Sequence, residues 1–115
     1  MEVKSVERGS NIGSFYKLST EERLRIVQEF SGLSDEEVQT LKTGALPGPS
    51  AQRMIENVVG VLPIPLGIAV NFLVNDKDYL IPMAIEEPSV VAAASHAAKM
   101  ARAKGGSGLA ALSPL

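Results

Sequence analysis

Two adjacent carboxylates, Glu86 and Glu87, end an apolar run and stand directly before Pro88. A proline holds the residue before it in extended backbone, so the position of Glu87 is restricted. If apolar neighbours shield this carboxyl, burial favours its protonated form, and it can then donate a proton to a substrate at neutral pH. A structural role is the more common one at such a position, because an acid at the start of a helix stabilises the helix dipole.

The two acids are expected to have different surroundings. Adjacent residues of a strand point to opposite faces of a sheet, so Glu86 and Glu87 should not share one site. One carboxylate should face a cleft, and the other should face the surface or an ion pair.

The other polar residues that could do chemistry give weaker signals. His96 is the only histidine and the chain has no cysteine, so a zinc site would need several carboxylates. Ser95 precedes His96, but neighbours in a helix do not face each other, which excludes a nucleophile pair. Asp76 and Asp78 flank Lys77 in a segment typical of a solvated turn rather than a metal loop. We therefore expect no metal site.

Two helix starts can be located from local signals. The spacing S-x-x-E occurs at Ser19–Glu22 and again at Ser34–Glu37, and in this capping box the hydroxyl and the acid each satisfy a backbone amide of the other residue. Glycines at 32 and 44 are typical of helix C-termini. The sequence predicts two short helices between these signals.

The rest of the chain predicts a third helix, a hairpin and a last helix, which together give an α+β fold. Apolar residues at helical spacing predict a helix over 51–59. Two apolar runs, 68–74 and 79–85, flank a turn-forming N-D-K-D segment and predict an antiparallel hairpin with both faces covered. Pro88 suits the first position of an alanine-rich helix that continues to Ala103.

The composition is that of one small globular domain. The chain has 115 residues, 45% of them hydrophobic, and its net charge of −2 gives no electrostatic reason to expect nucleic acid. Its first ten residues are polar and show no secretory signal. The longest apolar stretch, 58–74, contains prolines and glycines and does not suit a membrane span. We expect a cytoplasmic protein without a membrane or nucleic-acid partner.

Two long stretches carry a recognisable pattern: E-N-V-V-G-V-L-P-I-P-L-G-I-A-V-N-F at 56–72, and the stretch with E-E-P-S at 78–106. Both resemble the N-terminal part of the 3-hydroxy-3-methylglutaryl-CoA (HMG-CoA) reductase family. F-Y-K-L-S-T-E-E-R-L at 15–24 and T-G-A-L-P at 43–47 are also similar, and the closer match is to the soluble class II enzymes of bacteria and archaea. The similarity covers about residues 14–106.

The resemblance implies an oxidoreductase of mevalonate and isoprenoid metabolism that interconverts HMG-CoA and mevalonate with NAD(H) or NADP(H). It implies that Glu87 is the catalytic proton donor and that Ser89 contacts the HMG portion. Lys17 is the nearest match to a basic residue that holds the CoA phosphate. A homodimer interface beside the active site would include Glu56, Asn57, Val58, Val59 and Gly60.

The resemblance also implies that this chain is an N-terminal fragment of such an enzyme. The family's catalytic lysine, aspartate and histidine, and its D-A-M-G-x-N nicotinamide segment, have no counterpart here, so we expect no cofactor to bind this segment alone and no activity. The alternative is a non-catalytic dimerisation or assembly module. The expected organisation is a flexible N-terminus (1–13), an N-terminal helical segment (14–47), the start of the substrate-binding large domain (48–106) and a divergent tail (107–115).

Overall fold

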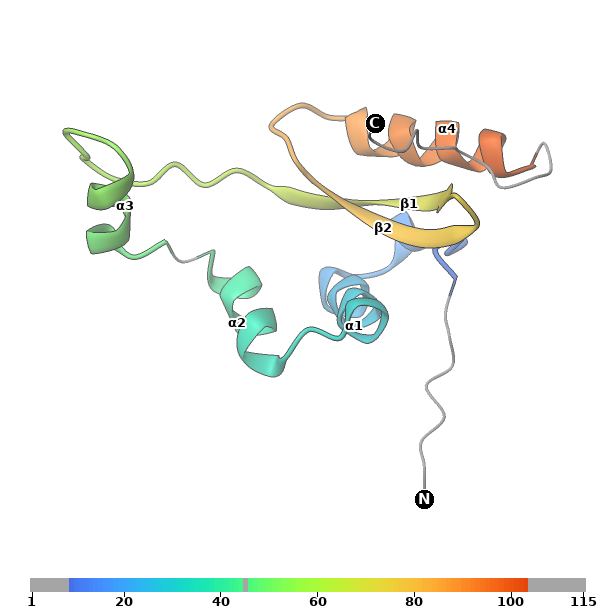
Figure 1. Ribbon diagram of the computed structural model, residues 1–115, viewed down its shortest axis with the longest axis horizontal. Coiled ribbons are helices and arrows are strands. Elements are labelled where there is room, and N and C mark those ends of the chain that lie inside the picture. The colour runs from blue at the N-terminus through green and yellow to red at the C-terminus, as the bar shows by residue number, and fades with distance from the viewer. Residues whose placement is uncertain (1–8, 45, 104–115) are drawn as a thin grey trace, which may run out of the picture.

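The computed structural model describes residues 9–44 and 46–103. In chain order the elements are η1 (Phe15–Lys17), α1 (Thr20–Ser31), α2 (Asp35–Thr43), α3 (Gly48–Met54), β1 (Leu66–Val74), β2 (Lys77–Ala84) and α4 (Val90–Ala103). The hairpin lies between α1 and α4 (Figure 1). The predicted α+β fold, with N-terminal helices, a hairpin and an alanine-rich helix, is confirmed.

Both predicted capping boxes are present. The Ser19 hydroxyl accepts a hydrogen bond from the Glu22 amide, while the Glu22 carboxylate accepts one from the Ser19 amide. The same reciprocal pair begins α2. Gly32 and Gly44 end the two helices with φ of 72° and 61°, a conformation that glycine adopts without strain. Local signals therefore decide where α1 and α2 begin and end.

The third helix differs from the prediction of 51–59. It runs over Gly48–Met54, with a proline in its first turn, and Ile55 after it is extended. The apolar spacing predicted a longer helix, but Met54, Ile55 and Val59 are 69%, 65% and 103% exposed. A helix in a protein is stabilised mainly by burying an apolar face. Without such burial the helical pattern beyond Met54 does not form a helix.

The hairpin is confirmed, and it contains a bulge. Asn75 and Asp76 connect the strands, and both have positive φ, as two-residue hairpin turns require. The pairing is irregular between Ala69 and Phe72. Asn71 lies within this bulge with φ of 72°, so the strand is locally bent there.

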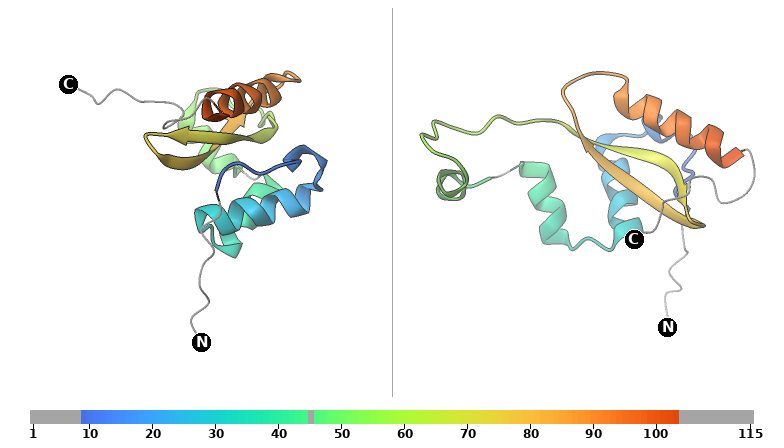
Figure 2. Two further views of the ribbon diagram at one scale, coloured as in Figure 1. Left: turned by 90° about the vertical axis from the view of Figure 1, so that its right-hand side faces the viewer. Right: turned by 45° about the horizontal axis from the view of Figure 1, so that its top comes forward.

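Helices lie on both sides of the hairpin, but the cover predicted for both faces is partial, because several residues of β2 are exposed. Helix α4 lies along one face and α1 along the other (Figures 1 and 2). On the side of α4 the backbone is close, because a methyl group added to Gly67 would lie 3.1 Å from Val91 Cγ2. On the other side Phe15, Ile26 and Val70 form a buried cluster. A two-stranded sheet needs such cover to be stable.

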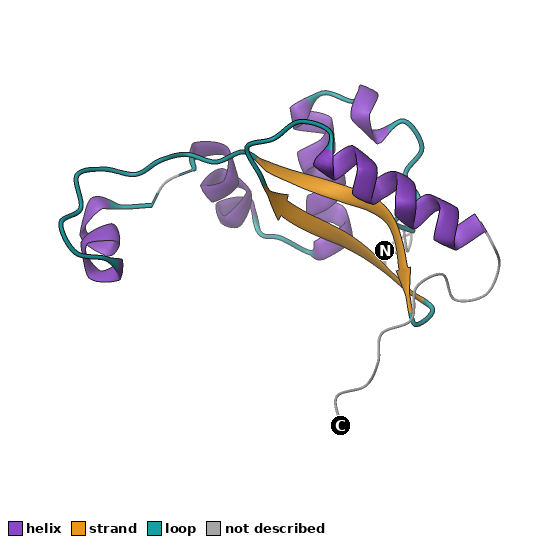
Figure 3. Ribbon diagram, turned by 90° about the horizontal axis from the view of Figure 1, so that it is seen from above, coloured by secondary structure: helices purple, strands orange, loops and turns teal. Residues whose placement is uncertain are grey.

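The connector between α3 and β1 runs away from this core (Figure 3). Its proline-rich part is extended, as the sequence predicts. Val59 and Leu62 within it are 103% and 84% exposed. Exposed apolar runs of this kind mark contact surfaces more often than free solvent-facing loops.

Helix α4 starts later than predicted. It begins at Val90, so the assignment of Pro88 to the first helical position is wrong. The Ser89 carbonyl accepts the bond from the Ala93 amide at 2.8 Å, and Ser89 itself has φ of 75°. The chain therefore turns sharply between Pro88 and the helix.

Residues 9–13 differ from the flexible start that the sequence predicts for 1–13. Ser10 is fully buried, and its carbonyl accepts a bond from the Asn71 amide. Residues 1–8 and the predicted tail at 107–115 lie outside the described residues. Across 9–44 and 46–103, no helix combines the length and the apolar character needed to cross a membrane.

Replacing the cap of α1, Ser19→Ala, should lower the free energy of unfolding by about 1 kcal/mol, because the Glu22 amide loses its acceptor. Urea denaturation followed by circular dichroism measures this. Ser31→Ala, an exposed serine at the other end of α1, is the matched control and should change stability by less than about 0.5 kcal/mol. Equal losses in both variants would contradict the capping role.

Candidate functional site

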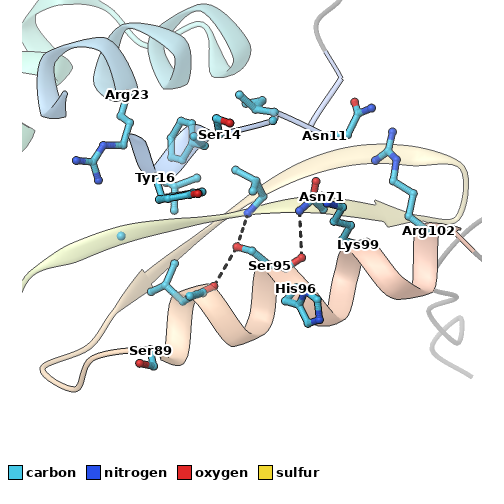
Figure 4. A pocket seen from close by; sticks show the side chains of 18 of the residues that line it. Asn11, Ser14, Tyr16, Arg23, Asn71, Ser89, Ser95, His96, Lys99 and Arg102 are labelled. Atoms are coloured by element: carbon cyan, nitrogen blue, oxygen red, sulfur yellow. Dashed lines mark hydrogen bonds between the residues drawn. The ribbon is translucent and has the colours of Figure 1, made fainter. Parts of the chain in front are cut away.

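A cavity of about 850 Å³ lies at the edge of β1, between α4 and the N-terminal segment. Residues 11–16 form one wall, and one side of α4 forms the other (Figure 4). Gly67, Ile68, Val70 and Asn71 of β1 line it between these walls. Its size is within the range of pockets that bind small molecules and cofactors.

The polar lining of the cavity is positively charged. Arg23 of α1 and Lys99 and Arg102 of α4 contribute cations, and His96 of α4 also lines the cavity. Among the described residues that line the cavity, none is an aspartate or a glutamate. Apolar side chains such as Ile12 and Val91 make up much of the remaining lining. This combination suits a ligand with anionic groups and an apolar part.

Ser95 joins α4 to the bulge of β1. Its hydroxyl accepts a hydrogen bond from the Val70 amide at 3.0 Å and donates one to the Val91 carbonyl at 2.9 Å. The Asn71 side-chain amide donates to the Ser95 carbonyl at 3.1 Å (Figure 4). These bonds fix the distance between the helix and the strand along the floor of the cavity.

Asp78, Ser10 and Arg102 form a second network, beside the last turns of α4. Asp78 Oδ1 accepts bonds from the Ser10 amide at 2.9 Å and from the Arg102 guanidinium at 2.8 Å. Desolvation by burial, the largest single effect, raises the pKa of Asp78, but the hydrogen bonds from Ser10 and Arg102 together outweigh it and lower the pKa below its usual value. The carboxylate is therefore stabilised in its charged form.

Of the residues that the resemblance assigns to the substrate, the structure brings Ser89 to the cavity. Lys17 does not line it; its ammonium lies 5.7 Å from the ring centroid of Tyr16, and Tyr16 is the lining residue. The basic residue that α1 contributes to the lining is Arg23.

The argument that placed Glu86 and Glu87 on opposite faces of a strand is wrong, because β2 ends at Ala84. Both carboxylates lie in the bend before α4, both are exposed, and neither lines this cavity. The described residues leave the Glu87 side chain without an apolar cover. Its assignment as proton donor stays a prediction.

Residues 56–60 lie in the connector, away from the lining of the cavity. Glu56, Asn57, Val59 and Gly60 are exposed, and Val58 is half-buried. Asn57 has φ of 56°, which turns the chain out of α3. The predicted interface segment therefore exposes most of its residues to solvent.

The sequence analysis missed the three cations of the cavity. None of the motifs described from the sequence assigns a role to Arg23, Lys99 or Arg102. One signal was available on α4. Ser89, Ala92, His96 and Lys99 share one helical side at spacings of three and four residues, and all four line the cavity.

A sequence profile of the hydroxymethylglutaryl-coenzyme A reductase family matches residues 19–113. The match covers most of the chain and reaches into 107–115, the segment that the sequence analysis set apart as divergent. The chain belongs to the HMG-CoA reductase family.

Individual relatives agree with this assignment. The chain is 67% identical over 97 residues to the 3-hydroxy-3-methylglutaryl-coenzyme A reductase of Archaeoglobus fulgidus, a match that covers 84% of this chain and 22% of that protein. It is 53% identical over 47 residues to a probable reductase of Borreliella burgdorferi, covering 41% of this chain and 11% of the relative.

The fold also matches a solved structure. The class II reductase of Streptococcus pneumoniae bound to NADPH superposes with a TM-score of 0.72 at 38% sequence identity, and the match covers 82% of this chain and 26% of that one. The chain thus spans about a quarter or less of the length of these relatives.

Replacing the carboxylate of the network, Asp78→Asn, should lower the free energy of unfolding by about 1–2 kcal/mol at neutral pH, because charged hydrogen bonds are lost. The pKa of Asp78 is lower in the folded chain than its usual value of 3.8, so its contribution is present above that value and is lost as the pH falls below it.

The difference in stability between wild type and Asp78→Asn should therefore shrink between about pH 5 and pH 3. Urea denaturation across this range measures it. Asp76→Asn, two residues away in the exposed turn, removes the same charge and is the matched control. A difference that stays constant with pH would contradict the role of the Asp78 charge.

Proposed function

We propose that this chain forms the substrate-binding part of a class II HMG-CoA reductase, an enzyme that interconverts HMG-CoA and mevalonate with NADPH or NADH. The observation that carries the proposal is the cationic cavity with Ser89 at its edge, in a chain of this family. The likeness to the class II enzyme of Streptococcus pneumoniae supports the class. The cytoplasmic location belongs to the same proposal and stays a prediction from the sequence.

The cavity is suited to a coenzyme A thioester. Coenzyme A carries several phosphate groups on a long, less polar chain, and cations in a partly enclosed site attract such groups strongly. Arg23, Lys99 and Arg102 would contact the phosphates, while Ile12 and Val91 would contact the less polar part. Ser89, at the N-terminal end of α4, would then donate a hydrogen bond to the HMG group.

We assign the proton transfer to Glu87, which lies two residues before Ser89. When a hydride adds to the thioester carbon, the carbonyl oxygen gains negative charge, and a proton from a nearby acid neutralises it. Glu87 is exposed in the described chain, so bound substrate or further protein must cover this carboxyl for efficient transfer. The nicotinamide supplies the hydride when it is bound, and we assign no residue of this chain to it.

The 115-residue chain by itself should not oxidise NADPH or NADH in the presence of HMG-CoA, since it spans only 22% of the Archaeoglobus fulgidus reductase. The measurement is a spectrophotometric assay of the purified chain. Turnover above the background without protein would contradict this expectation.

Coenzyme A should bind the chain, and Arg23→Ala should weaken that binding about tenfold, because one phosphate contact is worth roughly 1.4 kcal/mol. Isothermal titration calorimetry measures the dissociation constant. Arg25→Ala is the matched control, because Arg25 lies on the same helix, is exposed and does not line the cavity.

Two results of this titration would refute the cavity as the substrate site. One is a wild-type chain that does not bind coenzyme A. The other is an equal loss in Arg23→Ala and Arg25→Ala, which would mean that only the overall charge of the chain matters.

A second candidate, a non-catalytic assembly module, is favoured by the exposed apolar connector. Val59 and Leu62 are 103% and 84% exposed, and Ile64 and Leu66 follow with more than half of their surfaces exposed. A monomer rarely leaves such a run in water. We propose that residues 56–60 and this run form the contact of a homodimer, either within the enzyme or in the chain alone.

The dimer contact predicts that Val59→Glu shifts the chain from dimer to monomer, because a charge is then buried in an apolar interface. Light scattering after gel filtration measures the mass. Gln39→Glu adds the same charge to the exposed side of α2 and should leave the dimer intact. A monomeric wild-type chain would rule out this module for the chain alone.

A further inference from the structure

Ser10 connects three elements that surround the cavity. Its carbonyl accepts a bond from the Asn71 amide of β1 at 2.9 Å, and its own amide donates to Asp78 of β2 at 2.9 Å. Its hydroxyl lies 2.9 Å from the Phe72 carbonyl and 2.7 Å from Asp78 Oδ1. Arg102 of α4 donates to the same hydroxyl from 3.2 Å.

These contacts use both the donor and an acceptor site of the serine hydroxyl. A hydroxyl has one proton to donate and can accept from other donors. With Arg102 donating to it, the Ser10 hydroxyl donates to the Phe72 carbonyl or to Asp78. Ser10 is 0% exposed, and no described side chain has a buried polar atom without a partner. Loss of this one hydroxyl would remove one bond from Arg102 and weaken the network around Asp78.

The position of Ser10 matters because a wall of the cavity begins directly after it. Residues 11–16 form that wall, and Arg102 lies on the opposite side, at the last turns of α4 (Figure 4). Arg102 uses Nη1 for both of its bonds, to Asp78 and to Ser10. A guanidinium has five N–H donors in a fixed plane, so these two bonds also fix the orientation of the remaining donors.

We propose that Ser10 and Asp78 are positioning residues for the cavity: they hold residues 11–16 against β1 and orient the Arg102 guanidinium toward a bound anionic ligand. The choice of coenzyme A as the ligand rests on the function proposed above, whereas the attachment of the wall does not.

A first experiment tests the attachment without any ligand. Amide hydrogen exchange measured by NMR follows the Asn71 amide in wild type, Ser10→Ala and Asp78→Asn. This amide donates a hydrogen bond to the Ser10 carbonyl. In both variants the exchange rate of the Asn71 amide should rise about tenfold more than the rates of the α1 amides. The reason is that only the local opening of the N-terminal segment from β1 becomes easier. Ser31→Ala and Asp76→Asn are the matched controls and should leave the Asn71 rate unchanged. Equal acceleration at all amides would overturn the proposal, because it would show a loss of overall stability alone.

A second experiment tests the orientation of Arg102 with coenzyme A as the probe. In chains shown by circular dichroism to be folded, Ser10→Ala and Asp78→Asn should each raise the dissociation constant about tenfold, although neither side chain is among the lining residues. Two independent variants cover the case in which one of them fails to fold. Unchanged affinity in a folded variant would overturn the proposal.

The two experiments separate this proposal from the function on which its ligand rests. If coenzyme A does not bind wild type, the proposed function fails. Selective exchange at Asn71 would in that case still support the attachment of the wall by Ser10 and Asp78.

Discussion

The outer edge of β1 at its bulge is the constraint on which the arrangement of the chain depends. Val70 and Asn71 lie in the irregular part of the hairpin, so their amides do not follow the regular ladder to β2. The Val70 amide donates to the Ser95 hydroxyl of α4, and the Asn71 amide donates to the Ser10 carbonyl. A buried amide without an acceptor destabilises a fold by about 1–3 kcal/mol. Both acceptors are therefore required. The Ser95 hydroxyl holds α4 at one side of the cavity, and the Ser10 carbonyl holds the N-terminal segment at the other.

The position of the cavity follows from this constraint. Helix α4 and the N-terminal segment approach the same strand edge from different sides, and hydrogen bonds keep both at a fixed distance from it. Apolar packing covers the faces of the hairpin, through Phe15 and Ile26 on one side and through α4 on the other. The edge between those layers stays open. Cations from α1 and α4 line this opening, which gives it a charge opposite to that of a phosphate ligand.

The parts of the fold that could be predicted from the sequence are those set by neighbouring residues. The capping boxes at Ser19 and Ser34 and the turn at Asn75 and Asp76 are local, and all of them form. The extent of α3 could not be predicted from spacing, because Ile55 and Val59 stay exposed in the part of the chain that the structure describes. The prediction that Glu86 and Glu87 point to opposite faces of a strand is wrong, because β2 ends at Ala84, before both acids.

The site was harder to predict, because its residues converge only after folding. Ser89 came from resemblance, whereas Arg23 and Lys99 lie on different helices and meet at one cavity. Ser10 and Asp78 are 68 positions apart, and no local pattern links a serine in a polar start to a hairpin aspartate. A polar residue that is completely buried becomes visible only in three dimensions.

The central claim is that a coenzyme A thioester occupies the opening beside β1 with its reacting end at the start of α4. A crystal structure of the chain grown with HMG-CoA tests this claim directly. We expect the HMG group within hydrogen-bond distance of Ser89, with the thioester facing Glu87 and the phosphates against Arg23 and Lys99. A ligand bound elsewhere on the chain, with Ser89 and both cations free of contact, would contradict the account.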